Sequence, residues 1–222
     1  MPSLLVENVT YRYRNSGVAA VKDANCIFDL GKLYAIMGPS GSGKSTLLSI
    51  LAGLDIPNDG DVRYGDRSIR EMDLDRYRRE DVSMIFQAFQ LFPLLTVVEN
   101  VCYPMELSGV DPKDARSRAE VFLERVGIMG DKLKRFPSNL SGGEQQRVAI
   151  ARSLASGAKI ILADEPTGNL DVANSENIME ILKGLAHEDG YCVIVVTHDL
   201  DVAKASDIMY RMSDGVLSPT TA

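Results

Sequence analysis

Four short runs of apolar residues along the chain are each followed directly by polar residues or by glycine. The runs KLYAIM, VSMIF, KIILA and YCVIVVT lead to Gly38, Gln87, the pair Asp164 and Glu165, and His198. Runs without polar–apolar alternation are typical of strands buried on both faces of a parallel sheet. Ligands of open α/β sheets bind beyond the carboxyl ends of the strands, so we expect these polar residues to converge on one site.

A helical pattern separates the last two runs. Between about residues 171 and 186, four aliphatic residues fall on one side of a helix: Ile178, Ile181, Leu182 and Leu185. A strand, a helix and a strand at this spacing form a βαβ unit. The pattern therefore predicts an α/β fold built on a parallel sheet.

The N-terminal part has a different pattern. The segments LLVENVTYRYR and VAAVKDANCIFDL, joined through NSG, predict two strands, and the pair Asp59 and Gly60 in PNDGDVRYGD predicts a turn. We expect a small antiparallel sheet packed on the parallel core.

The strand pattern stops between about residues 88 and 140. Within this stretch DARSRAEVFLERVGI places five apolar residues on one helical face: Ala115, Ala119, Phe122, Leu123 and Val126. We expect one domain over residues 1–222. In it a helical subdomain at 88–154 is inserted into a core formed by 1–87 and 155–222, which includes the antiparallel sheet.

Composition narrows the class of protein. A length of 222 residues suffices for one large domain with a good core. The net charge of −7 argues against a sequence-independent nucleic-acid binder, so we expect no nucleic-acid partner. Cys26, Cys102 and Cys192 have no metal-binding spacing and predict buried small side chains in a reducing compartment. The absence of a signal pattern and of any apolar run near ~18 residues predicts a chain that is neither exported nor membrane-spanning.

The clearest chemical motif is a glycine-rich phosphate loop. GPSGSGKST satisfies G-x-x-x-x-G-K-[ST] between a predicted strand and the helical TLLSILAG, a placement that disfavours a merely flexible turn. Backbone N–H groups of such a loop and the following helix N-terminus bind phosphate. The predicted ATP-binding residues of this loop are Gly38, Pro39, Ser40, Gly41, Ser42, Gly43, Lys44, Ser45 and Thr46.

Other polar residues complete a nucleotide hydrolase. Lys44 would reach the β- and γ-phosphates and Ser45 would ligate Mg²⁺. Asp164 ends a buried strand, where Mg²⁺ is the natural partner of its carboxylate, and Glu165 could activate the attacking water as general base. Either residue could instead be a solvated acid at a strand end, but the phosphate loop favours catalysis.

His198 and Gln87 have the same strand-end placement. His198 could bond the γ-phosphate or orient the water, and Gln87 could contact Mg²⁺ or water and swing away when the insert moves. Alone, each would more often be structural, but convergence with the other motifs favours function. His187 is expected to be an exposed residue without a role. Tyr11 and Tyr13 share a face, and either could stack on adenine, although sheet packing explains one of them equally well.

A second anion site is predicted at LSGGEQQRVAIARSL. Ser141 and Glu144 form a capping box, which starts a helix at Ser141. Gly142 and Gly143 each disfavour that helix by roughly 1 kcal/mol, which suggests a binding role. The phosphate of the same chain is already held by the first loop, so we expect this helix to cap the γ-phosphate of a second copy in a head-to-tail dimer.

These motifs resemble those of the ATP-binding cassette (ABC) ATPases over essentially the whole chain. They are the phosphate loop GPSGSGKS, the signature LSGGE, the Walker B strand IILADE, the D-loop GNLD, the Q-loop residue Gln87 and the switch residue His198. The resemblance implies a P-loop NTPase fold with a RecA-like parallel core, an N-terminal antiparallel β subdomain and an inserted α-helical subdomain. It also implies adenine stacking on Tyr13, a nucleotide contact by Asp171 of the D-loop, and two ATP molecules with Mg²⁺ between two copies. The metal ligands would be Ser45, Gln87 and Asp164.

Within the family the motifs resemble a branch of lipoprotein-release, macrolide-export and antimicrobial-peptide ATPases and the related cell-division ATPase. This implies an ATPase on the cytoplasmic face of the cell membrane that powers a permease for export of, or resistance to, amphiphiles. The alternative is a non-transporting, mechanotransmitting ATPase of the cell-division type. LFPLLTVVENVCYPM is either the permease-docking surface or the core of the insert. A GTPase is disfavoured because N-K-x-D is missing, and a DNA-repair ABC ATPase because the insert is too short for a coiled coil.

Overall fold

The computed structural model describes residues 3–14 and 16–220 and contains two β-sheets. The smaller sheet is antiparallel, in the order β2-β1-β4-β5, and consists of β1 (Leu4–Tyr11), β2 (Val21–Phe28), β4 (Asp59–Tyr64) and β5 (Arg67–Ser68). The larger sheet has the order β10-β9-β3-β8-β7-β6 and is parallel from β9 to β6. Its strands are β3 (Lys32–Met37), β6 (Val82–Ile85), β7 (Ile160–Asp164), β8 (Cys192–Thr197), β9 (Ile208–Ser213) and β10 (Val216–Pro219).

Four of the five parallel strands, β3, β6, β7 and β8, come from the four apolar runs, as predicted. Met37 of β3 pairs with Thr197 of β8, and Val196 pairs with Asp164 of β7, so these strands end at one edge of the sheet. Side chains of β8 alternate between two cores because successive residues of a strand point to opposite faces. Ile194 and Val196 enter the core beneath the smaller sheet, while Val193 and Val195 enter the core beneath the helices.

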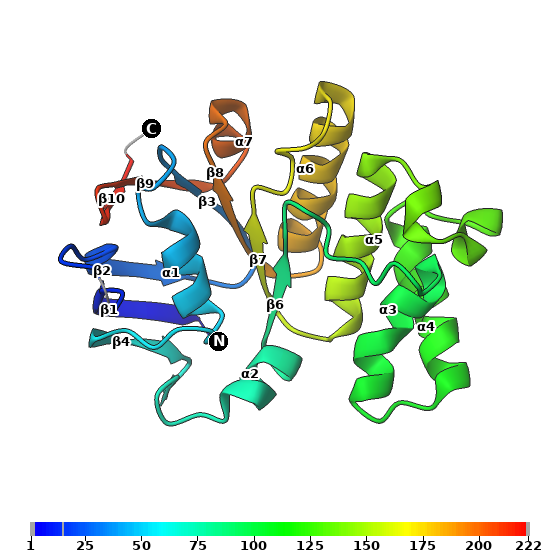
Figure 1. Ribbon diagram of the computed structural model, residues 1–222, viewed down its shortest axis with the longest axis horizontal. Coiled ribbons are helices and arrows are strands. Elements are labelled where there is room, and N and C mark those ends of the chain that lie inside the picture. Colours follow the sequence, from blue (N-terminus) through cyan, green and yellow to red (C-terminus); the bar gives the residue numbers. More distant parts are fainter. Residues whose placement is uncertain (1–2, 15, 221–222) are drawn as a thin grey trace.

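The helices form separate layers (Figure 1). Their bounds are α1 (Lys44–Leu51), α2 (Leu74–Glu80), α3 (Val97–Leu107), α4 (Pro112–Arg125), α5 (Gly142–Ala155), α6 (Val172–His187) and α7 (Leu200–Lys204), with 3₁₀ turns at Gly130–Lys134 and Pro137–Asn139. Helix α1 is buried between the two sheets, and α6 packs on the opposite face of the parallel sheet. Helices α3, α4 and α5 pack on one another beside β6.

The predicted helical faces are buried. Ala115, Ala119, Leu123 and Val126 of the α4 segment lie in the core of the helical region, and Phe122 is partly buried against it. Because α5 also contacts β6 and α6, the helical region and the parallel sheet share one continuous hydrophobic core.

The prediction of a turn at Asp59–Gly60 is wrong. Both residues belong to β4, and the register between β1 and β4 shifts at this point. Gly60 has φ +76°, and a Cβ there would lie 2.3 Å from the carbonyl oxygen of Asn8. The glycine therefore marks a bulge that lets two backbones approach, and the chain reverses later, at Gly65.

The expectation for the cysteines is met. The three cysteines are free and buried, as small hydrophobic side chains. Over residues 3–14 and 16–220, no helix has both the length and the apolar character needed to cross a membrane.

Candidate functional site

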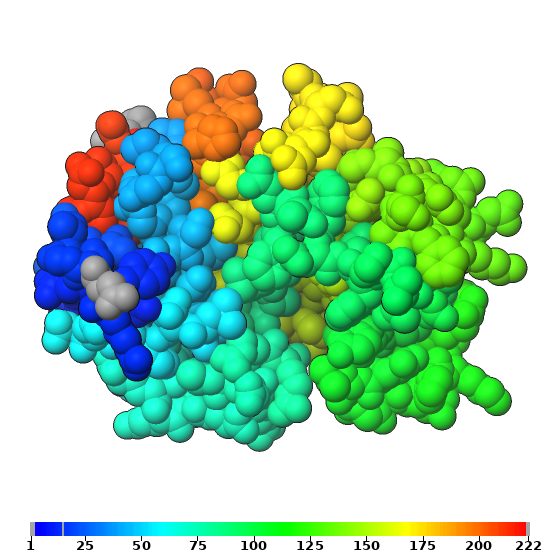
Figure 2. All heavy atoms as spheres, in the orientation of Figure 1, coloured from blue at the N-terminus to red at the C-terminus, as the bar shows by residue number. Residues whose placement is uncertain are grey.

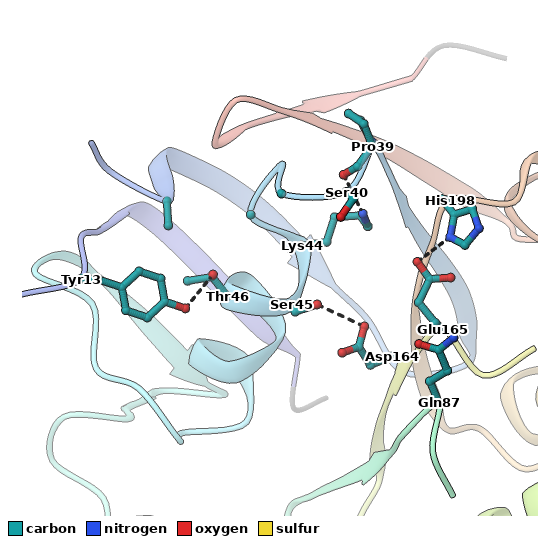
Figure 3. Close-up of a pocket in the computed structure, with 13 residues that line it drawn as sticks. Tyr13, Pro39, Ser40, Lys44, Ser45, Thr46, Gln87, Asp164, Glu165 and His198 are labelled. Atoms are coloured by element: carbon teal, nitrogen blue, oxygen red, sulfur yellow. Dashed lines mark hydrogen bonds and ion pairs between the residues drawn. The ribbon is translucent and has the colours of Figure 1, made fainter. Parts of the chain in front are cut away.

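A cavity of about 830 Å³ opens at the carboxyl edge of the parallel sheet (Figure 3). This volume lies within the range of small-molecule sites. Its lining residues are Tyr13, Ala20, Pro39, Ser40, Gly41, Gly43, Lys44, Ser45, Thr46, Gln87, Asp164, Glu165 and His198. Of the strand-end residues singled out from the sequence, Gln87, Asp164, Glu165 and His198 thus meet at one place.

The phosphate loop connects β3 to α1. Gly43 takes φ +107° at the start of α1, and among the described residues no side chain caps this helix end. Its first amides therefore face the cavity as anion donors. Gly38 and Ser42 do not line the cavity: a Cβ on Gly38 would lie 2.1 Å from the carbonyl oxygen of Met212, and Ser42 is buried.

Lys44 is held over the loop by its own backbone. Its Nζ donates to the carbonyl oxygens of Gly38 (2.8 Å) and Pro39 (2.9 Å), and the side chain is buried. An ammonium group has three donors, so one remains for an anion in the cavity. This geometry suits the predicted phosphate contact.

Ser45 and Asp164 are the residues that fit a magnesium ion. Ser45 Oγ donates to Asp164 Oδ1 at 3.3 Å. Burial raises the pKa of Asp164, and the Glu165 carboxylate adds to this effect, while Ser45 and Lys44 oppose it. In the described part of the chain no group of three or more His, Cys, Asp and Glu could hold a metal alone. Mg²⁺ commonly binds one or two protein oxygens together with substrate phosphates, which matches this small donor set.

Glu165 and His198 form a pair at the far wall of the cavity. His198 Nδ1 lies 2.9 Å from Glu165 Oε1, as the dashed line in Figure 3 marks. Glu165 adopts φ +48°, a costly conformation for a side-chain-bearing residue, and its N–H donates to the carbonyl of Val196. Strand pairing and the imidazole together aim this carboxylate, as a general base requires.

Gln87 lines the cavity but bonds elsewhere. Its Nε2 donates to Asn169 Oδ1 (3.4 Å), and Asn169 Nδ2 donates to the Gln87 carbonyl (3.0 Å). A Cβ on Gly168 would lie 2.7 Å from Gln87 Nε2, so the glutamine side chain packs closely on the 168–169 loop. The expected contact with Mg²⁺ stays a prediction, and Asn169 is a partner that sequence reasoning missed.

Tyr13 is the tyrosine that faces the cavity. Its hydroxyl lies 3.0 Å from Thr46 Oγ1, and its ring meets that of Tyr11 edge to face. Tyr11 instead donates to Asp55 Oδ1, so it belongs to the packing of the small sheet. Ala20 also lines the cavity and was missed, because an alanine in a loop carries no chemical signal.

The second predicted anion site lies apart from the cavity. Ser141 Oγ accepts from the Glu144 N–H and Glu144 Oε2 accepts from the Ser141 N–H, which confirms the capping box. Lys132 lies 2.7 Å from the other carboxylate oxygen. Lys132, followed by the Ser141 backbone bond, lowers the pKa of Glu144 to about 2. None of residues 141–143 lines the cavity.

Packing explains why a glycine stands at position 143, which the sequence did not reveal. A Cβ at this position would lie 2.2 Å from Asn174 Oδ1 in the first turn of α6. That asparagine is fixed by Asp171, which caps α6 and accepts from both Asn174 nitrogens. The glycine is therefore required by packing within one chain. The inference of anion binding from the poor helix propensity of glycine then applies to Gly142 alone. Asp171 lies outside the cavity, and its predicted nucleotide contact stays a prediction.

Comparison with known proteins agrees with this geometry. A family model described as "ABC transporter" matches residues 21–168. The uncharacterized ABC transporter ATP-binding protein YclH of Bacillus subtilis is 41% identical over 97% of this chain and 95% of its own length. The macrolide export ATP-binding/permease protein MacB of a Shewanella species is 41% identical over 94% of this chain, which spans 32% of that protein.

Solved structures extend the comparison to the whole fold. The dimeric structure of MJ0796, described as a bacterial ABC transporter cassette, has a TM-score of 0.88 and 39% identity, with 99% of each chain covered. The same protein is known in a dimeric post-hydrolysis state bound to ADP and Pi, at the same TM-score and identity.

Proposed function

Because the chain belongs to the ABC transporter family and is an ATP-binding, ATP-hydrolysing subunit, we propose that two copies close head-to-tail over two ATP molecules to drive a membrane permease. The observation that carries this proposal is the position of residues 141–143. They form a capped helix start outside the cavity that holds the phosphate loop. A second copy would bring its own residues 141–143 to that cavity, and the relative MJ0796 is described as a dimer.

Within the cavity each residue has a distinct task. The loop from Gly38 to Thr46 and the first amides of α1 hold the phosphates, and Lys44 supplies the positive charge. Ser45 and Asp164 would hold Mg²⁺, which neutralises phosphate charge. Glu165 accepts the proton of the attacking water, and His198 fixes the carboxylate that does so. Tyr13 stands at the cavity wall where an adenine ring would stack.

A groove between α2 and α3 supports docking of the permease. It has a volume of about 250 Å³ and is lined by Arg78, Ser83, Met84, Phe92, Tyr103, Pro104, Arg152, Ser153 and Ser156. Figure 2 shows the surface hollowed between the blue-green segment that contains α2 and the green segment that contains α3. Phe92 and Tyr103 are exposed there with their ring centroids 4.7 Å apart.

The stretch LFPLLTVVENVCYPM therefore has two parts. Val97, Val98 and Val101 are buried in the helical core, whereas Leu94 is 87% exposed beside Phe92. Exposed apolar side chains next to a groove suit an interface with another protein. The permease would hold the chain at the cytoplasmic face of the membrane. The similarity to macrolide exporters favours export of amphiphilic compounds.

Glu165→Gln tests the proposal. The amide keeps the size of the side chain but cannot take a proton, so turnover should fall by about 10²-fold or more while ATP binding is retained. The variant should elute as a dimer on size exclusion with ATP and as a monomer without it. Glu188→Gln, at the exposed end of α6, is the matched control and should hydrolyse ATP like the wild type. A Glu165→Gln protein that binds ATP and stays monomeric at every concentration would overturn the dimer.

A further inference from the structure

Directly after Gln87 the backbone adopts an unfavourable conformation. Phe89 and Gln90 have φ +60° and +50°, in the left-handed region that costs side-chain-bearing residues about 1–3 kcal/mol each. The Gln90 N–H donates to the Ala88 carbonyl, which closes a tight turn. Two consecutive residues in this region persist only where other contacts hold them.

Arg152 supplies those contacts. From the last turn of α5, its Nη1 donates to the Gln90 carbonyl (2.6 Å) and its Nη2 to the Phe89 carbonyl (3.1 Å). The guanidinium also lies over the ring of Phe92, 5.8 Å from its centroid. A planar fork of two donors matches two adjacent carbonyls, a geometry that the single ammonium of lysine cannot reproduce.

The helix that carries Arg152 is rigidly placed. Val148, Ile150, Ala151 and Leu154 of α5 are buried in the shared core. The same helix begins at the capped residues 141–143. The Arg152 fork therefore ties the turn at 89–90 to the element that carries the signature residues.

We propose that Arg152 is a positioning residue that holds the Phe89–Gln90 turn. As a result Gln87, at the ATP cavity, and Phe92, at the docking groove, move together with α5. Gln87 lies two residues before the turn and Phe92 two residues after it. A conformational change at the docking groove would thereby be transmitted to the ATP cavity through a strained segment with few accessible conformations. The proposal rests on the proposed ATPase function and on the role that the sequence predicts for Gln87 in it, a contact with Mg²⁺ or with the attacking water.

Loss of the fork would release the turn toward negative φ and displace Gln87. Arg152 lies outside the cavity, so nucleotide binding should be nearly unaffected. The expected signature is a fall in kcat without a matching change in ATP affinity, because the group lost acts on the geometry of the reacting complex.

Arg152→Lys is the first test, because it keeps the charge and removes the fork. We expect kcat per folded molecule to fall about 10-fold or more, with the Kd for a fluorescent ATP analogue within twofold of the wild type. Hydrogen exchange of amides 86–92 should accelerate. Arg116→Lys is the matched control: its guanidinium forms an exposed ion pair with Glu120 on α4, so kcat and exchange should not change. If both variants have the same kcat and exchange, the proposal is wrong.

Gln90→Pro tests the turn without altering Arg152. Proline fixes φ near −65°, which excludes the left-handed conformation, and the Gln90 side chain is exposed. This variant should show the same loss of kcat with retained ATP affinity, and wild-type turnover would contradict the proposal. If neither Arg152→Lys nor Gln90→Pro folds, the turn is required for stability, and this outcome would also overturn a positioning role.

Gln87→Ala separates this inference from the proposed function. If Gln87→Ala hydrolyses ATP like the wild type, the role proposed for Gln87 fails, and the positioning role fails with it. If Gln87→Ala is impaired and Arg152→Lys is not, only the positioning role fails. Impairment of both, with accelerated exchange at 86–92 in Arg152→Lys alone, is the outcome that the structure leads us to expect.

Discussion

Asp164 illustrates how a site residue can destabilise the chain that carries it. Burial raises the pKa of its carboxyl above the ordinary 3.8, so the folded state binds more protons than the unfolded state. Stability contributed by this group therefore falls as pH rises from about 3.8 through the raised folded pKa. Above the raised folded pKa the full penalty is present, and a bound cation would remove it.

Asp164→Asn should consequently stabilise the protein when no metal is bound. We expect Tm in EDTA at pH 7 to rise, because the neutral amide does not carry the desolvation penalty of the buried carboxylate. The amide oxygen can still accept from Ser45, and the gain should vanish near pH 3. With ATP and Mg²⁺ the order should reverse, because only the wild type gains the full binding free energy. A lower Tm for Asp164→Asn in EDTA at pH 7 would mean that the carboxylate is favourably solvated.

Individual residues were predictable where their own chemistry is visible. Asp164, Glu165 and His198 lie at the ends of buried strands, and parallel strands bring their ends together. Lys44 was predictable from the phosphate-loop motif that follows β3. Arg152 was not predictable, because its partners are backbone carbonyls 62 and 63 residues away, at a turn that no motif marks. Asn169 and Ala20 were not predicted either, because their place in the site depends on contacts with neighbouring residues rather than on a reactive side chain.

At the scale of elements, the α5–α6 contact decides what Gly143 is for. Gly143→Ala would place a Cβ 2.2 Å from Asn174 Oδ1. Overpacking costs about 1–3 kcal/mol, and the better helix propensity of alanine returns about 1 kcal/mol. We expect a net loss of about 1 kcal/mol in the free energy of unfolding, measured by urea denaturation.

The sign of this effect should reverse in a second background. In Asn174→Ala the obstructing amide is gone, so adding Gly143→Ala should then stabilise the protein. Such a reversal shows coupling between two residues in contact. If Gly143→Ala has the same effect in both backgrounds, the glycine is not required by packing against α6.

Elements themselves were predictable where their pattern is periodic and long. The strands β3, β6, β7 and β8 and the helices α4 and α6 follow from continuous apolar runs or from one apolar face. The Asp59–Gly60 pair was misassigned because a glycine with positive φ serves a bulge as well as a turn. The hairpin of β9 and β10 was not predicted, since its exposed, mixed residues such as Arg211 and Ser213 show no clean pattern.

At the scale of the whole molecule, the ATP cavity and the signature helix start lie at separate places on one chain. In a head-to-tail dimer each complete site takes Lys44 from one copy and Ser141 from the other. A chain that lacks Lys44 and a chain that lacks Ser141 are then each inactive alone, since every site in either homodimer is damaged. A mixed dimer of the two keeps one site in which both residues are intact.

Mixing Lys44→Ala with Ser141→Arg should therefore restore ATP hydrolysis. In an equimolar mixture about half of the dimers are mixed, and each has one of two sites intact, so roughly a quarter of wild-type activity is expected if the sites act independently. The recovered rate should depend on total protein concentration, because the mixed dimer must form. A mixture of two preparations of Lys44→Ala is the control and should stay inactive. If the two variants together remain as inactive as each alone while the wild type hydrolyses ATP, Lys44 and Ser141 act within one chain, and the second anion site does not belong to a partner.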